Sequence, residues 1–161
     1  MDAEREFAEY FAARGQAMRR MAYALCGDWH TAEDLVQSTF VRLYRHWRTI
    51  RRPTVDAYAR RTLLNLFLSR RRGAWREQVV PEVPERVAAA PGTEDRIDLA
   101  RALALLSPRQ RAMVVLRYLE DQSVAEVAEL LGVAEGTVKS QTARGVQALR
   151  TALGDRVLSG R

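Results

Sequence analysis

Five polar side chains near the C-terminus recur at a spacing that suits hydrogen bonding to DNA. They are Glu135, Thr137, Lys139, Ser140 and Arg144. Four further residues recur between them every three or four positions, at Val138, Thr142, Gly145 and Leu149. This interval predicts a helix that buries the second set and turns the first set outward. Donors and acceptors on the outer face of such a helix can reach base edges and phosphates in a major groove.

A shorter helix precedes this one and would position it. Ser123 lies three residues before Glu126, which is the spacing of a capping box and predicts a helix start. Gly132 supplies the left-handed residue that ends the helix, so residues 132–134 form a turn. The predicted buried face comprises Val124, Val127, Ala128 and Leu131. The pair has the outline of a helix-turn-helix and makes DNA the leading partner, although an ordinary helical hairpin in a core is the alternative.

A second candidate interface is the arginine-rich segment between residues 42 and 76. It holds eleven arginines and one aspartate, so its net charge of +10 exceeds the +6 of the whole chain, whereas residues 77–100 carry −4. Each arginine that neutralises a phosphate releases counterions, so this segment predicts salt-dependent binding to nucleic acid. The alternative is a solvated charged face.

Aromatic and amide side chains are interleaved with these arginines, at Trp47, Tyr58, Asn65 and Trp75. Aromatic faces and an amide can hold an unstacked base. Each has a structural alternative: Trp47 and Tyr58 also lie at core spacing, and Asn65 can cap a helix or bond to the backbone.

Helical periodicity dominates the chain, and no alternating run is long enough to predict a sheet. We therefore expect an all-α protein of two small helical domains. The first, residues 1–76, would hold three helices, the first ending near Gly27, the second opening at Thr31 and the third spanning residues 54–72. Three prolines and Gly92 predict an extended linker, which we place at residues 77–95. The second domain, residues 96–161, would add two helices before the helix-turn-helix, the later one starting at Ser107-Pro108.

Apolar residues at helical spacing predict the two cores. In the first domain they are Phe7, Phe11, Met18, Met21, Ala22, Leu25, Leu35, Val36, Phe40, Leu43, Tyr44, Trp47, Val55, Tyr58, Ala59, Leu63, Leu66 and Phe67. In the second domain they are Ile97, Ala100, Leu103, Leu106, Met113, Val114 and Leu119.

Composition argues against several other classes of protein. Cys26 is the only cysteine, so no intramolecular disulfide or thiolate metal cage can form, and His30 and His46 lack partners at metal-ligand spacing. We expect no metal and no cofactor. No nucleophile, base and orienting group and no phosphate-binding glycine loop can be assembled, so we do not expect an enzyme. Without a leader or an apolar run of about 18 to 20 residues, we expect a cytoplasmic protein with no membrane insertion.

Taken together, these segments resemble a bacterial sigma factor of the extracytoplasmic-function (ECF) group, over roughly residues 7–153. AEDLVQSTFVRLYRHW, residues 32–47, is similar to the region-two helix that docks on the polymerase clamp, and DAYARRTLLNLFLSRRR, residues 56–72, to the helix that engages the minus-ten element. LSPRQRAMVVLRYLEDQSVAEVAELLGVAEGTVKSQTARG, residues 106–145, resembles region four, which reads the minus thirty-five element. Its QTARG ending is similar to the SigE branch.

This resemblance implies binding to core RNA polymerase, direction of that enzyme to specific promoters, and DNA opening driven by binding energy. The implied polymerase-docking residues are Asp34, Leu35, Gln37, Arg42 and Leu43, with core burial as the alternative for the two leucines. The implied contacts to the downstream element and the nontemplate single strand, with one flipped base in a pocket, are Arg48, Arg51, Arg52, Arg60, Arg61, Asn65, Arg70 and Arg71. A possible further partner is an anti-sigma protein that masks both domains.

For the upstream element of promoter duplex DNA, the resemblance implies phosphate or guanine contacts by Lys139 and Arg144 and lighter polar contacts by Thr137 and Ser140. Glu135 would either accept from a cytosine or favour the helix N-terminus.

Two positions depart from the family pattern. Ala134 stands where a hydroxyl or carboxamide cap is common, which weakens the helix start by roughly 1 kcal/mol. Gln141 stands where many relatives have arginine, so a groove contact there would be less electrostatic. Two other functions fit the same features: a stand-alone helix-turn-helix regulator, which usually needs a dimer, and a helical adaptor whose basic face meets an acidic protein.

Overall fold

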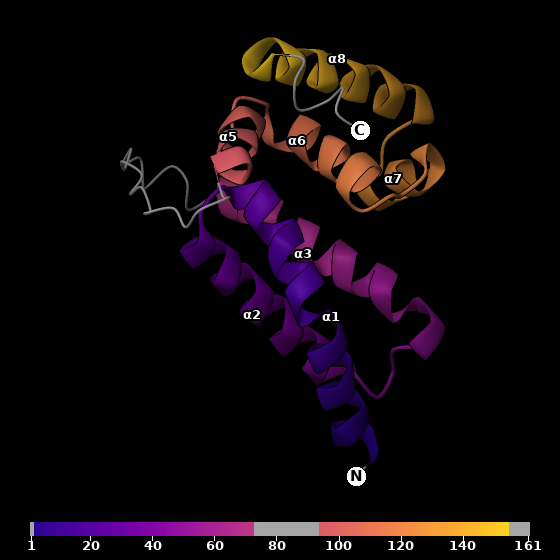
Figure 1. Cartoon of the computed structure of the whole chain (residues 1–161). Helices are drawn as coiled ribbons and strands as arrows, with labels where there is room; N and C mark the ends of the chain where they lie inside the picture. The colour runs from indigo at the N-terminus through magenta and orange to yellow at the C-terminus, as the bar shows by residue number, and fades with distance from the viewer. Residues whose placement is uncertain (1, 73–93, 155–161) are drawn as a thin grey trace. The chain divides into compact units, whose positions relative to one another are not determined.

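The computed structural model describes residues 2–72 and 94–154, with side chains described at residues 2–69 and 99–154. Every regular element in these ranges is helical, and the chain divides into two compact units, Met1–Ser69 and Arg70–Arg161 (Figure 1). The prediction of an all-α protein with two helical domains is confirmed. Except for Glu94 and Asp95, the predicted linker lies outside the described residues, so its boundaries stay a prediction.

The first unit is built on a hairpin of two long helices. Helix α1 (Asp2–Cys26) packs along α2 (Trp29–His46), and Gly27, at φ +78°, forms the corner between them. A short 3-10 turn, η1 (Arg52–Thr54), then leads into α3 (Val55–Arg72). The loop between α2 and η1, η1 itself and the first half of α3 carry five of the seven arginines predicted to bind the downstream element, namely Arg48, Arg51, Arg52, Arg60 and Arg61.

The start of α2 differs from the prediction. The cap is Asp28, whose carboxylate accepts from the backbone N–H of His30 at 3.3 Å and of Thr31 at 3.1 Å. Thr31 was expected to open the helix, but it lies in the first turn and donates its hydroxyl to Asp28. An ionised carboxylate caps a helix at least as well as a hydroxyl, so the aspartate three residues earlier takes the position.

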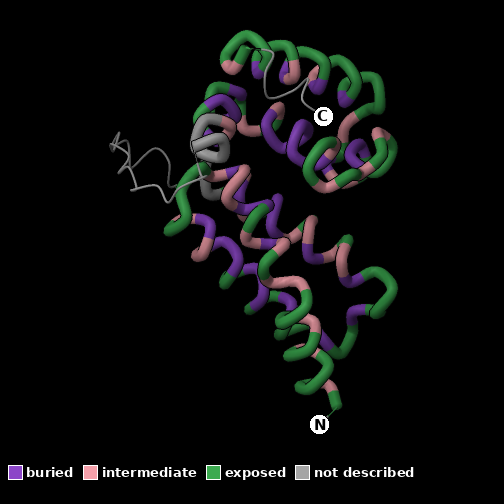
Figure 2. The backbone as a smooth tube through the Cα atoms, in the orientation of Figure 1, coloured by how far each residue is buried: buried purple, intermediate pink, exposed green. Residues whose placement is uncertain are grey.

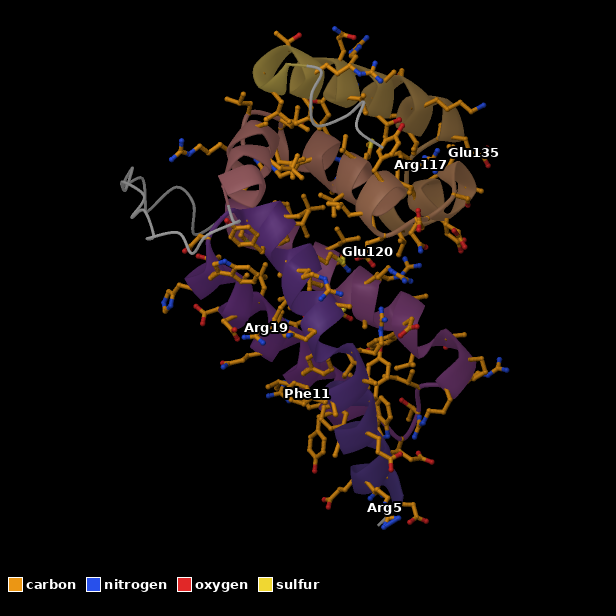
Figure 3. The ribbon with its side chains drawn as sticks, viewed as in Figure 1. Arg5, Phe11, Arg19, Arg117, Glu120 and Glu135 are labelled. Carbon is orange, nitrogen blue, oxygen red and sulfur yellow. The ribbon has the colours of Figure 1, made fainter. Side chains whose placement is uncertain are left out.

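The core of the first unit contains most of the predicted residues, including Met21, Leu25, Leu63 and Phe67. Two aromatic residues that were expected inside are half exposed, Phe11 at 49% and Tyr44 at 51%. Their rings instead pack edge-on, Phe11 (labelled in Figure 3) against Phe40 and Tyr44 against Phe7. Helical spacing places them near the apolar stripe, but no further helix covers them in the described part of this unit.

The second unit contains α5 (Glu94–Leu103), α6 (Pro108–Val114), a π-helical turn η2 (Val115–Leu119), α7 (Val124–Leu131) and α8 (Glu135–Leu153). Ser107 caps α6 by accepting from the Gln110 N–H at 3.2 Å. Leu119 was expected in the core but is 50% exposed, since the wider π turn shifts it off the buried side.

None of the helices in the described ranges combines the length and the apolar composition that a membrane crossing requires.

Candidate nucleic-acid interface

The predicted helix-turn-helix is formed by α7 and α8. Ser123 and Glu126 form the expected capping box, in which each side chain accepts from the backbone N–H of the other residue, at 3.0 and 2.7 Å. Gly132 ends α7 in the left-handed conformation, at φ +69°. The local signals in the sequence therefore predicted this motif correctly.

All five candidate contact residues of α8 are exposed, and the four positions expected inside are buried (Figure 2). Glu135 lies in the first turn, where its carboxylate is favourable to the helix N-terminus (Figure 3). No side chain caps α8, because position 134 is alanine. The face carrying Lys139 and Arg144 is thus a cationic, hydrogen-bonding surface with little local support at its N-terminal end.

Helix α6 holds α8 in place. A Cβ atom at Gly145 would meet Cγ2 of Val114 at 2.7 Å, so the glycine permits close approach of the two helices. Gln110 of α6 donates its amide to Oε1 of Gln141 at 2.9 Å. Gln141 is half-buried, and its side chain is turned toward α6.

Arginines of α6 also tie the unit together. Arg109 donates to the carbonyl of Leu131 at the end of α7, at 3.2 Å. Arg111 is buried and donates to the carbonyls of Leu103, the last residue of α5, and of Leu106, in the turn before α6, both at 2.9 Å. Sequence reasoning missed Arg111, because an arginine in a basic chain gives no local signal that it will be buried on a helix terminus.

The arginines of the first unit differ in how free their side chains are. Arg48, Arg51, Arg61 and Asn65 are exposed, and Arg60 is half-buried and engaged in an interaction. Arg61 and Asn65 lie one turn apart on α3 and share a face. Arg70 and Arg71 fall in the last turn of α3, and their side chains lie outside the described part, as does Trp75.

Arg52 is bound to the protein itself. Its guanidinium donates to the carbonyls of Trp47 at 3.0 Å and Ile50 at 2.7 Å, and to Oε1 of Glu6 on α1 at 2.7 Å. It also lies over the Trp47 ring, with 4.1 Å between Cζ and the centroid. Trp47 is 3% exposed, so burial, and not base stacking, describes its role. Tyr58, also considered for stacking, is half-buried.

A second polar link joins α1 to α3. The Tyr10 hydroxyl donates to Oδ1 of Asp56 at 2.6 Å, and Arg14 Nε lies 3.4 Å from the same oxygen. Burial, together with the hydrogen bond and the charge of Asp56, raises the pKa of Tyr10 above its ordinary value. The phenol therefore stays a neutral donor.

A hollow of about 270 Å³ lies beside the loop that follows α2. Its lining comes from the start of α1, the end of α2 and the loop that follows, with Ala3, Glu4, Tyr44, Arg45, Trp47, Arg48 and Thr49. This volume is near the lower end of the range that holds small ligands, about 300 Å³.

Of the residues predicted to dock on polymerase, Gln37 and Arg42 are exposed on α2 and Asp34 is half-buried. Leu35 and Leu43 are 1% and 0% exposed. Direct contact by these leucines is therefore wrong and the alternative of core burial is correct, because a partner surface cannot reach side chains that α1 and α2 already enclose.

Comparison with known proteins agrees with this geometry. The family model for sigma-70 region 2 matches residues 11–77, and that for sigma-70 region 4 matches residues 96–149. The chain is 40% identical to an RNA polymerase sigma-E factor of Streptomyces coelicolor, over 97% of this chain and 90% of that protein. It is 41% identical to the ECF RNA polymerase sigma factor SigE of Mycolicibacterium smegmatis, over 81% of this chain and 55% of that protein.

Among solved structures, the chain is similar to the sigma factor RpoE of Bartonella quintana, crystallised with the anti-sigma factor NepR. The TM-score is 0.78 at 29% identity, over 92% of this chain and 96% of that one. These matches do not favour the stand-alone regulator or the adaptor. With both sigma-70 regions present in order and a sigma-E relative matched along nearly its whole length, the chain belongs to the ECF group of RNA polymerase sigma factors, in its SigE-like branch.

Proposed function

We propose that the two helical units divide the work of a sigma factor between two parts of one promoter. As a member of its family the chain is not an enzyme, and it directs core RNA polymerase to promoters. The second unit would read the upstream element as duplex DNA, and the first would hold the downstream element once its strands separate. The observation that carries this division is the exposure of a separate cationic face on each unit.

The upstream contact would be made by α8 in the major groove. Lys139 and Arg144 would bind guanine or phosphate, Thr137 and Ser140 would add polar contacts, and Glu135 would support the helix start. All five side chains are exposed, and the opposite face of the helix is bound to α6.

The downstream contact would be made by the loop after α2 and by the exposed face of α3. Arg48 and Arg51 would bind phosphates of the nontemplate strand, and Arg61 and Asn65 would extend this surface along α3. The hollow beside Arg48 and Thr49 is the candidate place for one flipped base. Holding an extruded base uses binding energy to favour the open state, so no hydrolysis is required.

Polymerase docking would use the exposed side of α2, where Gln37 and Arg42 lie, together with Asp34. Leu35 and Leu43 would support that side from beneath. The chain must act in the compartment that holds core polymerase, so the cytoplasm is its proposed location. An anti-sigma partner is also proposed, since the similar RpoE structure was solved with the anti-sigma factor NepR.

Site-specific crosslinking tests the division of labour. A photo-crosslinking amino acid would replace Ser140 in one holoenzyme and Asn65 in another, with Ala12, exposed on α1, as a third control position. We expect the probe at 140 to label upstream duplex, and the probe at 65 to label the nontemplate strand near the start site only after opening. Labelling of the same DNA region from both positions would contradict the proposal.

A further inference from the structure

Arg52 makes a set of contacts within the protein that an arginine does not need in order to bind a DNA phosphate. Its NH1 group donates to two carbonyls, that of Trp47, the C-cap of α2, and that of Ile50 in the loop that follows, and its NH2 and Nε groups donate to Oε1 of Glu6, at 2.7 and 3.3 Å. The guanidinium carbon Cζ also lies over the buried Trp47 ring, 4.1 Å from its centroid. All three nitrogens are thus engaged within the protein.

The partner on α1 belongs to a regular series. Glu6, Tyr10 and Arg14 are spaced four residues apart, so they lie along one side of the helix, and we refer to them as the α1 seam. Glu6 meets Arg52, while Tyr10 and Arg14 meet Asp56, which follows Arg52 by four residues. The charges match along the seam, with an acid opposite the arginine and an arginine opposite the aspartate.

We propose that Arg52 is a positioning residue and not a DNA ligand, and that the α1 seam presets the loop and the start of α3 for capture of the nontemplate strand. This inference rests on the proposed function of the first unit. Arg52 ties the end of α2 to η1, so it determines the path of residues 48–51, which carry Arg48 and Arg51. The hydrogen bond from Tyr10 to Asp56 holds the first turn of α3 against α1, the helix that also holds Arg52.

Rigid placement matters here because a flexible loop would lose conformational freedom each time it ordered on DNA. A loop already held in its binding shape avoids that cost, so strand capture and promoter opening proceed faster.

Glu6→Gln is the decisive variant, because the two possible roles of Arg52 predict opposite effects of this change on the interaction with promoter DNA. If Arg52 bound phosphate, Glu6 would compete for it, and Glu6→Gln would strengthen DNA binding. If Arg52 is a positioning residue, Glu6→Gln loosens the loop and slows opening, even though the protein becomes more positive.

The experiment measures opening by holoenzyme on a promoter that the native chain opens, by permanganate reactivity of unpaired thymines, with closed-complex affinity measured separately at low temperature. The variants are Glu6→Gln, Arg52→Ala, their double and Arg52→Lys. Glu9→Gln, which removes the same charge from an exposed position on α1, is the matched control.

We expect Glu6→Gln and Arg52→Ala each to slow opening by roughly fivefold, as for loss of one exposed ion pair, and to leave closed-complex affinity unchanged. The double variant should open the promoter no more slowly than Arg52→Ala alone, because both changes remove the same Glu6–Arg52 interaction. Arg52→Lys should not restore the rate, since an ammonium group cannot make the forked contacts. Glu9→Gln should open as the native chain does.

The proposal is overturned if Glu6→Gln opens as fast as the native chain or faster, or if Arg52→Lys restores the rate. A decrease of about one in the slope of log affinity against log salt for Arg52→Ala would also assign Arg52 to a phosphate. Should Arg52→Ala fail to fold, Glu6→Gln alone decides. Asn65→Ala distinguishes failure of the proposed function from failure of this inference. If Asn65→Ala opens the promoter as the native chain does, the proposed strand-binding face of α3 is wrong. If Asn65→Ala slows opening but Glu6→Gln does not, only the positioning role of the α1 seam is rejected.

Discussion

Gly145 of α8 lies so close to α6 that a Cβ atom added to it would be 2.7 Å from Cγ2 of Val114. Carbon atoms that are not bonded do not approach to this distance, so α8 packs against α6 as closely as a glycine allows. The residue that permits this contact lies one position after Arg144, a proposed DNA contact. The stability of the second unit and the placement of the proposed DNA-contacting face of α8 are therefore linked through one backbone position.

Gly145→Ala should destabilise the second unit by about 1–3 kcal/mol, because the new methyl overpacks against Val114. Gly136→Ala is the matched control in the same helix, since a Cβ there meets nothing within 4 Å. That change should stabilise α8 by up to about 1 kcal/mol through helix propensity. Hydrogen exchange of α8 amides in the full chain measures both effects. Equal protection in the two variants would show that the contact between Gly145 and Val114 does not determine the stability of α8.

Arg144→Ala should weaken use of the upstream element roughly tenfold, as expected for one lost guanine or phosphate contact. Arg150→Ala removes the same charge from an exposed position two turns closer to the end of α8 and should have little effect. The measurement is promoter occupancy by holoenzyme on templates with and without the upstream element. Equal losses on both templates, or equal losses for both arginines, would indicate general charge neutralisation.

Asn65→Ala should impair promoter opening more than closed-complex binding, because the amide is proposed to act on the separated strand. Ser69→Ala, at an exposed position one turn further along α3, serves as the control. Footprinting of closed and open complexes separates the two steps. A variant that binds the duplex poorly but opens it normally once bound would contradict the assignment.

The Asp28 cap predicts an acid-dependent part of the stability. Burial raises the pKa of Asp28, but hydrogen bonds from the Thr31 hydroxyl and from the backbone N–H of Thr31 and His30 outweigh it, so the pKa lies below its ordinary value. A lowered native pKa means that this stabilisation is complete above the unfolded value of about 3.9 and is lost as the pH falls through the native value.

Asp28→Ala should therefore cost about 1 kcal/mol at neutral pH, and the difference from the native chain should shrink as the pH falls toward 3. Asp28→Asn keeps a capping oxygen without a titrating proton, so it should retain most of the stability and show less change with pH. Denaturant unfolding across this pH range measures the effect. If the difference in unfolding free energy between Asp28→Ala and the native chain stayed constant across this pH range, the ionised Asp28 cap would be excluded as its source.

Local sequence signals predicted the second unit well. Ser123 with Glu126, and Gly132, define the ends of α7 through contacts within a few residues, and the buried positions of α8 follow from its period. Such features depend on backbone groups close in the sequence, so the sequence is enough to identify them.

Features that depend on distant partners could not be predicted. Burial of Arg111, the bond between Gln110 and Gln141 and the engagement of Arg52 by Glu6 each join residues from different elements. The sequence presented Arg52 as one more arginine of a basic segment, and only its distance to Glu6 and Trp47 distinguishes it from Arg51. Leu35 and Leu43 show the same limit, because an apolar residue suits a core and an interface equally well until its exposure is known.

The most direct test of the central claim is run-off transcription with core RNA polymerase, this chain and genomic DNA fragments. The account predicts new transcripts with defined start sites that appear only when the chain is added, and that are lost when either of its two proposed promoter elements is altered. If the same core initiates specifically with another sigma factor but yields no start-site-specific transcript with this chain, the account is contradicted.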